Sequence, residues 1–218
     1  MRAFDTVTSP LRYLPRDHVD TDMVIRIERL VLVPRKDLGA YAFEMLRRLP
    51  DGTPDPACTL DRPGSEGAEI LLAGRNFGCG SSREAAVWAL AGYGIRAVVA
   101  QSFGDIFRQN CLKNGILPVA IGKAAHDALM ARAEQEPAMQ LTIDLPAQAV
   151  VTPGGQRIPF EIPAGEKDAL LKGEDDLART MARAEEIRAH FEAAEAARPW
   201  MRIDPGPLAE FTSDEERS

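Results

Sequence analysis

The chain has 218 residues, a formal net charge of -7 and 45% hydrophobic residues. That hydrophobic content can fill a core, so it excludes a globally disordered chain. The acidic balance, with scattered basic residues, argues against a nucleic-acid partner and against a membrane-surface patch. No apolar stretch is long enough to span a bilayer, and the N-terminus lacks an apolar signal segment. We therefore expect a cytoplasmic protein.

Cysteine usage points the same way. Cys58, Cys79 and Cys111 form an odd, widely spaced set, which favours reduced thiols over a disulfide framework. No two of them have the close spacing usual for an iron–sulfur cluster, and the three histidines lack zinc-ligand spacing. We therefore predict no metal site on this chain.

The N-terminal part predicts a strand, a capped turn and a long loop. Residues 6–16, punctuated by two prolines, predict a short strand and turn. Asp20, Thr21 and Asp22 precede an apolar stretch, as in a helix N-cap with an acidic first turn. Residues 50–67 are rich in Pro, Gly and Asp and predict a long loop, a feature that often carries function.

Strands and helices alternate from residue 69 to residue 119. The pattern predicts strands at 70–73, 96–100 and 116–119 and helices at 83–92 and 105–114, each helix capped by glycine, Gly92 or Gly115. Such alternation indicates right-handed crossovers and an α/β fold with a central parallel sheet. Ligands bind at the carboxyl ends of such strands, which is where Ser81, Ser82 and Ser102 fall.

The last third predicts a helix at 124–134 and antiparallel strands at 139–145 and 156–162, with Gly154 and Gly155 turning between them. An apolar stripe then follows one helical face and predicts core or a docking surface: Leu177, Met181, Ala184, Ile187, Phe191 and Ala194. We predict two domains, residues 1–181 and a C-terminal helix with a flexible acidic tail at 182–218.

Residues 76–84, which read Asn-Phe-Gly-Cys-Gly-Ser-Ser-Arg-Glu, are the most informative segment. A glycine-rich turn into a helix start directs unpaired N–H groups at one point, and Arg83 adds a planar cation suited to a carboxylate. The simple alternative is a capped turn, because glycine and serine commonly serve that role. The spacing matches neither the Walker loop nor the dinucleotide fingerprint. A catalytic Cys79 is the weaker interpretation, because no histidine lies nearby in the sequence.

Residues 20–22, 76–84 and 102–107 together carry a family resemblance, with further matches at Asn110, 114–119 and 173–177. In order along the chain, from about 18 to 181, they resemble the small subunits of 3-isopropylmalate dehydratases, the swivelling-domain members of the aconitase superfamily. The resemblance implies a swivelling β/β/α domain with a central, mainly parallel sheet and a C-terminal helical extension.

The resemblance also implies an activity and a partner. Members of this family pair with a large subunit that carries a [4Fe-4S] cluster, and the pair interconverts 2- and 3-isopropylmalate in leucine biosynthesis by dehydration and rehydration. The cluster would then lie on the partner and not on this chain. We expect a heterodimeric lyase whose isolated small subunit is inactive and self-associates through its exposed partner-facing surface.

Residue roles follow from the same resemblance. Ser81 would be the catalytic base, as an alkoxide, and Arg83 would hold a substrate carboxylate with both arms of its guanidinium. Ser82 and the Gly80 backbone would complete the substrate-binding cradle. Asp22 would position polar groups across the subunit junction. Arg26 is a further candidate for substrate binding.

The chain departs from the family pattern near the substrate region. Ile25-Arg26-Ile27 stands where Ile-Pro-Lys is usual, Arg83-Glu84-Ala85-Ala86-Val87-Trp88 replaces Arg-Glu-His-Ala-Pro-Trp, and Ala178 takes a glycine position. These changes leave open a related hydro-lyase acting on another malate-like acid, of the dimethylmalate, citraconate/methylmalate or homoaconitate type. A non-catalytic carboxylate-binding module and a redox protein dependent on Cys79 are alternatives from other classes.

Overall fold

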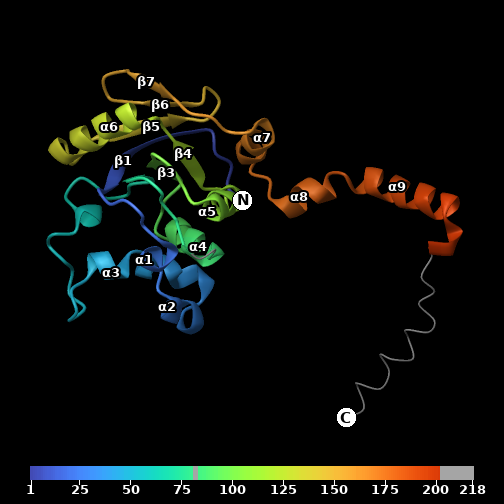
Figure 1. Cartoon of the computed structure of the whole chain (residues 1–218), viewed down its shortest axis with the longest axis horizontal. Coiled ribbons are helices and arrows are strands. Elements are labelled where there is room, and N and C mark those ends of the chain that lie inside the picture. The colour runs from blue at the N-terminus through green and yellow to red at the C-terminus, as the bar shows by residue number, and fades with distance from the viewer. Residues whose placement is uncertain (81–82, 202–218) are drawn as a thin grey trace, which may run out of the picture. The chain divides into compact units, whose positions relative to one another are not determined.

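The computed structural model describes residues 1–80 and 83–201 (Figure 1). The predicted base Ser81, its neighbour Ser82 and the predicted acidic tail from residue 202 onward lie outside the described residues. The chain divides into two compact units, Met1–Asp175 and a C-terminal unit that begins at Asp176. The domain boundary after residue 181 stays a prediction.

A seven-stranded mixed sheet organises the first unit, in the order β4-β3-β2-β1-β5-β6-β7. Its strands are β1 (Thr6–Leu14), β2 (Ile70–Ala73), β3 (Ala97–Ala100), β4 (Leu117–Ala120), β5 (Gln140–Asp144), β6 (Ala149–Val151) and β7 (Arg157–Pro159). Strands β1 to β4 pair in parallel, and β5, β6 and β7 continue from β1 in antiparallel fashion. The long strand β1 joins the two halves.

Strands β2 and β3 are buried on both faces, which explains their continuous apolar sequence. Because successive side chains of a strand point to opposite faces, Ile70 and Leu72 join one hydrophobic cluster while Leu71 and Ala73 join another. The first cluster includes residues of α6 (Lys123–Gln135) and α7 (Ala164–Lys172). The sheet is therefore the middle layer of the unit.

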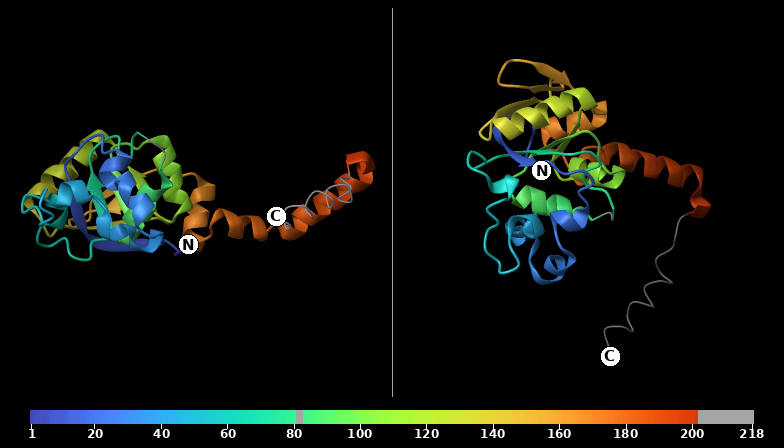
Figure 2. Two further views of the ribbon diagram at one scale, coloured as in Figure 1. Left: turned by 90° about the horizontal axis from the view of Figure 1, so that it is seen from below. Right: turned by 60° about the vertical axis from the view of Figure 1, so that its left-hand side comes forward.

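The second cluster packs the other face of the sheet (Figure 2). Its helices are α1 (Thr21–Val24), α4 (Glu84–Gly92), α5 (Asp105–Lys113) and the 3₁₀ helix η1 (Arg35–Tyr41). Helices α2 (Ile27–Leu32) and α3 (Glu44–Arg47) and the 3₁₀ helix η2 (Thr59–Asp61) complete the loop-rich segment between β1 and β2. The α/β fold class predicted from the sequence is confirmed, with an antiparallel extension on one side of its parallel strands.

Two local predictions are wrong. Gly92 is the last residue of α4, not its left-handed cap; Tyr93 caps the helix in a right-handed conformation, and Gly94 has the positive φ of 96°. Gly92 instead packs closely against η1, because a Cβ on Gly92 would lie 3.0 Å from both the N and the Cα of Gly39. The predicted strands at 139–145 and 156–162 do not pair with each other, because β6, too short to show a pattern, lies between them.

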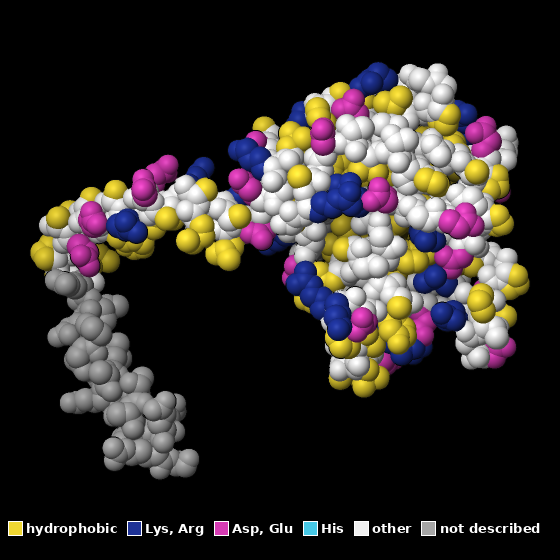
Figure 3. Space-filling model, turned by 180° about the vertical axis from the view of Figure 1, so that it is seen from behind, with side chains coloured by type: hydrophobic (Ala, Val, Ile, Leu, Met, Phe, Trp, Pro, Cys, Tyr) yellow, Lys and Arg dark blue, Asp and Glu magenta, His cyan; other side chains and the backbone are white. Residues whose placement is uncertain are grey.

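The C-terminal unit contains α8 (Asp176–Met181), α9 (Ala184–Ala197) and the 3₁₀ helix η3 (Pro199–Met201). Its apolar stripe is split over two helices instead of following a single one. Leu177, Met181 and Phe191 are exposed, so within this unit the stripe is surface and not core (Figure 3). Among the helices of residues 1–80 and 83–201, none combines the length and the apolar character that crossing a membrane requires.

Candidate active site

Asp20, Thr21 and Asp22 form the N-terminus of α1, and each side chain has a different environment. The Asp20 carboxylate caps the helix by accepting a hydrogen bond from the Met23 N–H at 2.8 Å. Thr21 is buried at 1% exposure, whereas the Asp22 side chain is half-exposed at 52%. The capped turn predicted from the sequence is confirmed, and it presents Asp22 to solvent.

The glycine-rich turn after β2 is built on a pair of aromatic rings. Phe77 and Phe107, both buried, meet edge to face with ring centroids 5.3 Å apart. Gly78 adopts a φ of 71°, and a Cβ there would lie 2.1 Å from Cγ of Phe107. Only glycine lets the backbone turn this close to the ring at this φ. The turn is therefore held at a fixed position against the start of α5.

Arg83 is the N-cap residue of α4, and its side chain reaches across to α1. The guanidinium donates a short hydrogen bond to the Asp22 carboxylate, forming an ion pair between the two predicted site residues. The Arg83 side chain is 22% exposed, so it is held by the fold while still meeting solvent. Because a planar guanidinium matches carboxylate geometry, this pair shows that a carboxylate can reach Arg83.

A polar pocket of about 240 Å³ lies at this point. Its lining comes from the α1 start, the glycine-rich turn and the α5 start: Thr21, Gly78, Cys79, Gly80, Arg83, Gly104, Asp105, Ile106 and Phe107. Three helices thus begin around one cavity, and their first N–H groups have no partner within the helix. Helix N-termini and Arg83 favour an anion in the pocket, whereas Asp105 in the lining and Asp22, which is paired with Arg83, oppose it.

The structure keeps other predicted residues out of this pocket. Arg26 precedes α2, and its guanidinium binds both carboxylate oxygens of Glu28 at 3.1 and 3.2 Å. Arg29, a second basic residue of that segment, is bound by Glu44 and lies 4.2 Å above the ring of Tyr41. The basic residues of α2 are therefore occupied by neighbours in this conformation.

The cysteines do not form a cluster site. Cys111 is fully buried in the core, where burial raises the pKa of its thiol well above the ordinary value and disfavours the thiolate that metals bind. Cys79 lines the pocket, whereas Cys58 lies at a separate cavity beside Leu60. Within the described part of the chain, no group of three metal-ligating side chains comes together. These residues do not fit an iron–sulfur cluster.

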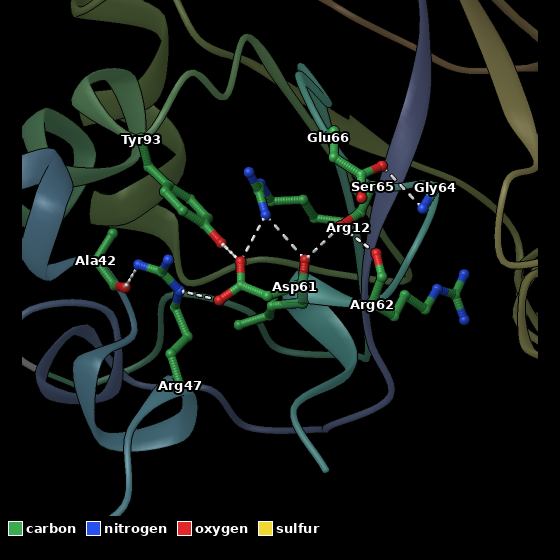
Figure 4. A network of polar contacts seen from close by, with 10 residues as sticks. Arg12, Ala42, Arg47, Asp61, Arg62, Gly64, Ser65, Glu66 and Tyr93 are labelled. Carbon is green, nitrogen blue, oxygen red and sulfur yellow. Dashed lines mark hydrogen bonds and ion pairs between the residues drawn. The ribbon is translucent and has the colours of Figure 1, made fainter. Parts of the chain in front are cut away.

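Sequence reasoning missed a polar network that ties the long loop to the domain (Figure 4). Asp61 accepts hydrogen bonds from Arg47 at 2.6 Å, Tyr93 at 2.7 Å and Arg12 at 2.9 Å. Burial alone would raise the pKa of the Asp61 carboxyl, but these hydrogen bonds and the two arginine charges outweigh it and hold the pKa below the ordinary value. Burial and the bond to Asp61 raise the pKa of Tyr93. No local sequence motif predicts this network, because its four residues come from distant segments of the chain.

A second polar network that the sequence did not predict involves α4, the helix that Arg83 caps. The Asn114 side chain accepts from Trp88 at 3.1 Å and donates to Glu84, the first residue of α4, at 2.8 Å. The guanidinium of Arg35 lies 4.2 Å above the Trp88 ring. The network connects the start of α4 to the end of α5, so it supports the helix that Arg83 caps. Asn114 lies in segment 114–119, one of the segments that carry the family resemblance. That resemblance is the sequence signal that could have identified Asn114.

Comparison with known proteins agrees with the fold. Residues 4–124 match the aconitase C-terminal domain family, and residues 127–164 match a family described as LeuD_N. The 3-isopropylmalate dehydratase small subunit 1 of Bordetella pertussis is 45% identical over 201 residues, covering 92% of this chain and 100% of the relative. The small subunit of Chloroflexus aurantiacus is 47% identical over 190 residues, with 87% and 94% coverage.

A solved structure, titled as the 3-isopropylmalate dehydratase LeuD of Methanocaldococcus jannaschii, superposes with a TM-score of 0.60 at 25% identity. It covers 85% of this chain and 98% of that one. The fold and site therefore define an α/β domain of the aconitase C-terminal type. Within that group, the chain belongs to the family of 3-isopropylmalate dehydratase small subunits.

Proposed function

We propose that this chain is the small subunit of a two-subunit hydro-lyase that interconverts 2- and 3-isopropylmalate in leucine biosynthesis. The observation that carries the proposal is the Arg83 guanidinium, held against a carboxylate at the edge of a polar pocket where three helices begin. An arginine so placed suits a dicarboxylate substrate, because its planar fork can bind one carboxylate with two hydrogen bonds. Relatives named for this enzyme cover nearly the whole chain.

The reaction requires a base and a stabilised anion. A C–H bond next to a carboxylate breaks, its electron pair forms a C=C bond, and the neighbouring C–O bond breaks as hydroxide leaves. Water then adds back with its hydroxyl on the adjacent carbon. We assign the base to Ser81 by family resemblance. The positive end of α4 and the Arg83 charge would favour its alkoxide form.

The remaining site residues would orient the substrate. Arg83 would bind a substrate carboxylate in place of, or together with, Asp22, and the Gly80 backbone and Ser82 would complete the cradle. Asp22 would keep the guanidinium aimed at the pocket before substrate arrives. Arg26 would take part only after exchanging Glu28 for substrate.

The partner would be a large subunit that carries a [4Fe-4S] cluster, since the described residues of this chain contain no ligand set for one. Such a cluster supplies Lewis acidity toward the leaving hydroxyl. Helix α2, directly after α1, exposes Ile27, Val31 and Leu32, and we propose that the partner covers this apolar surface. The free cysteines suit a cytoplasmic enzyme.

The test is co-purification with the cluster-bearing large subunit, followed by an ultraviolet assay for alkene formation on a panel of malates. The panel contains 2- and 3-isopropylmalate, dimethylmalate, citramalate and homocitrate. We expect turnover of the isopropylmalates by the pair and by neither subunit alone. Efficient turnover of another panel member, with none of the isopropylmalates, would replace the substrate assignment. A pair that binds carboxylates without turning any over would replace the enzyme by a binding module.

A further inference from the structure

The loops that leave β1 and β2 run side by side toward the site. The last sheet pairing between these strands joins Leu14 and Ala73, and the next backbone pairing joins Asp20 and Cys79. Segments of equal length, 15–19 and 74–78, lie between these two pairings. Asp20 begins the helix that carries Asp22, and Cys79 begins the turn that leads to Arg83. The geometry of these segments therefore sets where Asp22 and Arg83 meet.

Successive residues of segments 15–19 and 74–78 contact each other across the two loops. The Asp17 carboxylate accepts from the Arg75 backbone N–H at 2.9 Å and from its Nε at 2.8 Å. The His18 N–H donates to the Arg75 carbonyl at 2.9 Å. The next step is made by side chains alone, with Asn76 Nδ2 lying 2.9 Å from His18 Nδ1. The Gly78 N–H then donates to the Val19 carbonyl at 2.7 Å, just before the pocket.

The side-chain contact joins two residues in the left-handed backbone region, which asparagine and histidine tolerate better than most other non-glycine residues. His18 has a φ of 55° and Asn76 a φ of 53°, a left-handed conformation that glycine adopts more readily than histidine. His18 is exposed and Asn76 half-buried, so their hydrogen bond adds little to global stability. Local stability would favour glycine at both positions. Two non-glycine residues in this conformation that contact each other beside the pocket motivate the hypothesis of a role in that site.

We propose that His18 and Asn76 are a positioning pair for the reaction, holding the loop that carries Asp22 in register with the turn that carries Arg83. With Nδ1 of His18 accepting from the Asn76 amide, the neutral ring carries its proton on Nε2. Neither side chain lines the pocket, so the pair acts through the Asp22–Arg83 ion pair. Its catalytic consequence rests on the proposed function, whereas its effect on Arg83 geometry does not.

The test uses glycine substitutions, because glycine accepts the left-handed backbone and removes only the side-chain bond. The variants are His18→Gly, Asn76→Gly and the double variant, with His18→Asn as a conservative rescue that tolerates this backbone and offers an amide acceptor. Gln148→Gly is the matched control. Gln148 is also left-handed, with a φ of 50°, and its amide bonds to the Phe160 carbonyl in the antiparallel half of the sheet, away from the pocket.

The first measurement is the rate at which phenylglyoxal modifies Arg83 in the isolated full chain, followed by peptide mass spectrometry. Loosening the pair frees Arg83 from Asp22, so we expect faster modification in both glycine variants, a rate near wild type in His18→Asn, and no change in Gln148→Gly. Arg83 labelling that matches the control in every variant overturns the proposal. This measurement needs no partner, iron or substrate, so it remains decisive if the proposed function is wrong.

The second measurement is kcat and KM of the pair reconstituted with the large subunit. A displacement of about 1 Å at a reacting group can cost about a hundredfold in rate, so we expect kcat/KM to fall by about 10- to 100-fold in either glycine variant. The double variant should lose no more than a single one, as expected of a unit. We expect Tm to stay within about 3 °C of wild type. A larger drop in Tm than in Gln148→Gly would mark the pair as merely structural and overturn its positioning role.

Discussion

Gly78→Ala tests the packing that fixes the glycine-rich turn. The new Cβ would lie 2.1 Å from Cγ of Phe107, whose ring is 3% exposed and packs on the fully buried Phe77. The ring packs edge to face on Phe77, so making room for the new Cβ disturbs this ring pair, the turn or the start of α5. Overpacking of this kind costs about 1–3 kcal/mol, and a non-glycine residue at a φ of 71° costs about 1–2 kcal/mol more. We expect a loss of about 2–5 kcal/mol.

Thermal unfolding of the isolated chain, followed by circular dichroism, measures this loss. For a protein of this size the expected decrease in Tm is on the order of 10 °C. Gly52→Ala is the matched control, because Gly52 has a φ of 83° but no atom within 4 Å of the added Cβ. Its cost should be the backbone part alone, about 1–2 kcal/mol. Equal Tm values for the two variants would refute the packing argument.

Further predictions concern Arg83, Asp61 and Cys111. Arg83→Lys should raise KM by about 10- to 100-fold, because a point charge loses the two-armed grip worth about 1.5–3 kcal/mol; an unchanged KM in the reconstituted pair would contradict the assignment. The lowered pKa of Asp61 contributes stability above the ordinary aspartate pKa of about 4, and that contribution disappears as pH falls below it. The Tm advantage of wild type over Asp61→Asn should therefore shrink between pH 7 and pH 3; a pH-independent difference would argue against the ion pairs. Cys111→Ser buries a hydroxyl in the core and should cost about 1–3 kcal/mol in urea unfolding; a change below 0.5 kcal/mol would show that the site is wet.

The strands β2 and β3 and the glycine-rich turn into α4 were predictable because their signals are local. An apolar run such as 70–73 predicts a strand buried on both faces, and a glycine-rich turn before a helix-forming run predicts a helix start. Arg83 and Asp22 were predicted as site residues from the family motifs, and the fold brings their side chains together as an ion pair. What each residue contacts could not be read from spacing.

The unpredicted features depend on contacts between distant segments. Asp61 meets Arg12, Arg47 and Tyr93 only after the long loop folds back on β1 and α4. A glycine at position 92 predicts a left-handed helix cap, but Gly92 lies inside α4 and packs against η1. His18, which has no ligand spacing, gains a role only beside Asn76. In each case the decisive partner lies outside the local window in which sequence patterns operate.

The central claim is that this chain supplies the base and the carboxylate grip while its partner supplies iron. Ser81→Ala in the reconstituted pair tests that claim most directly, with complex formation measured by size-exclusion chromatography and dehydration measured by alkene absorbance. We expect a complex that assembles normally, binds isopropylmalate and has no detectable turnover. Turnover at near wild-type rate would contradict it.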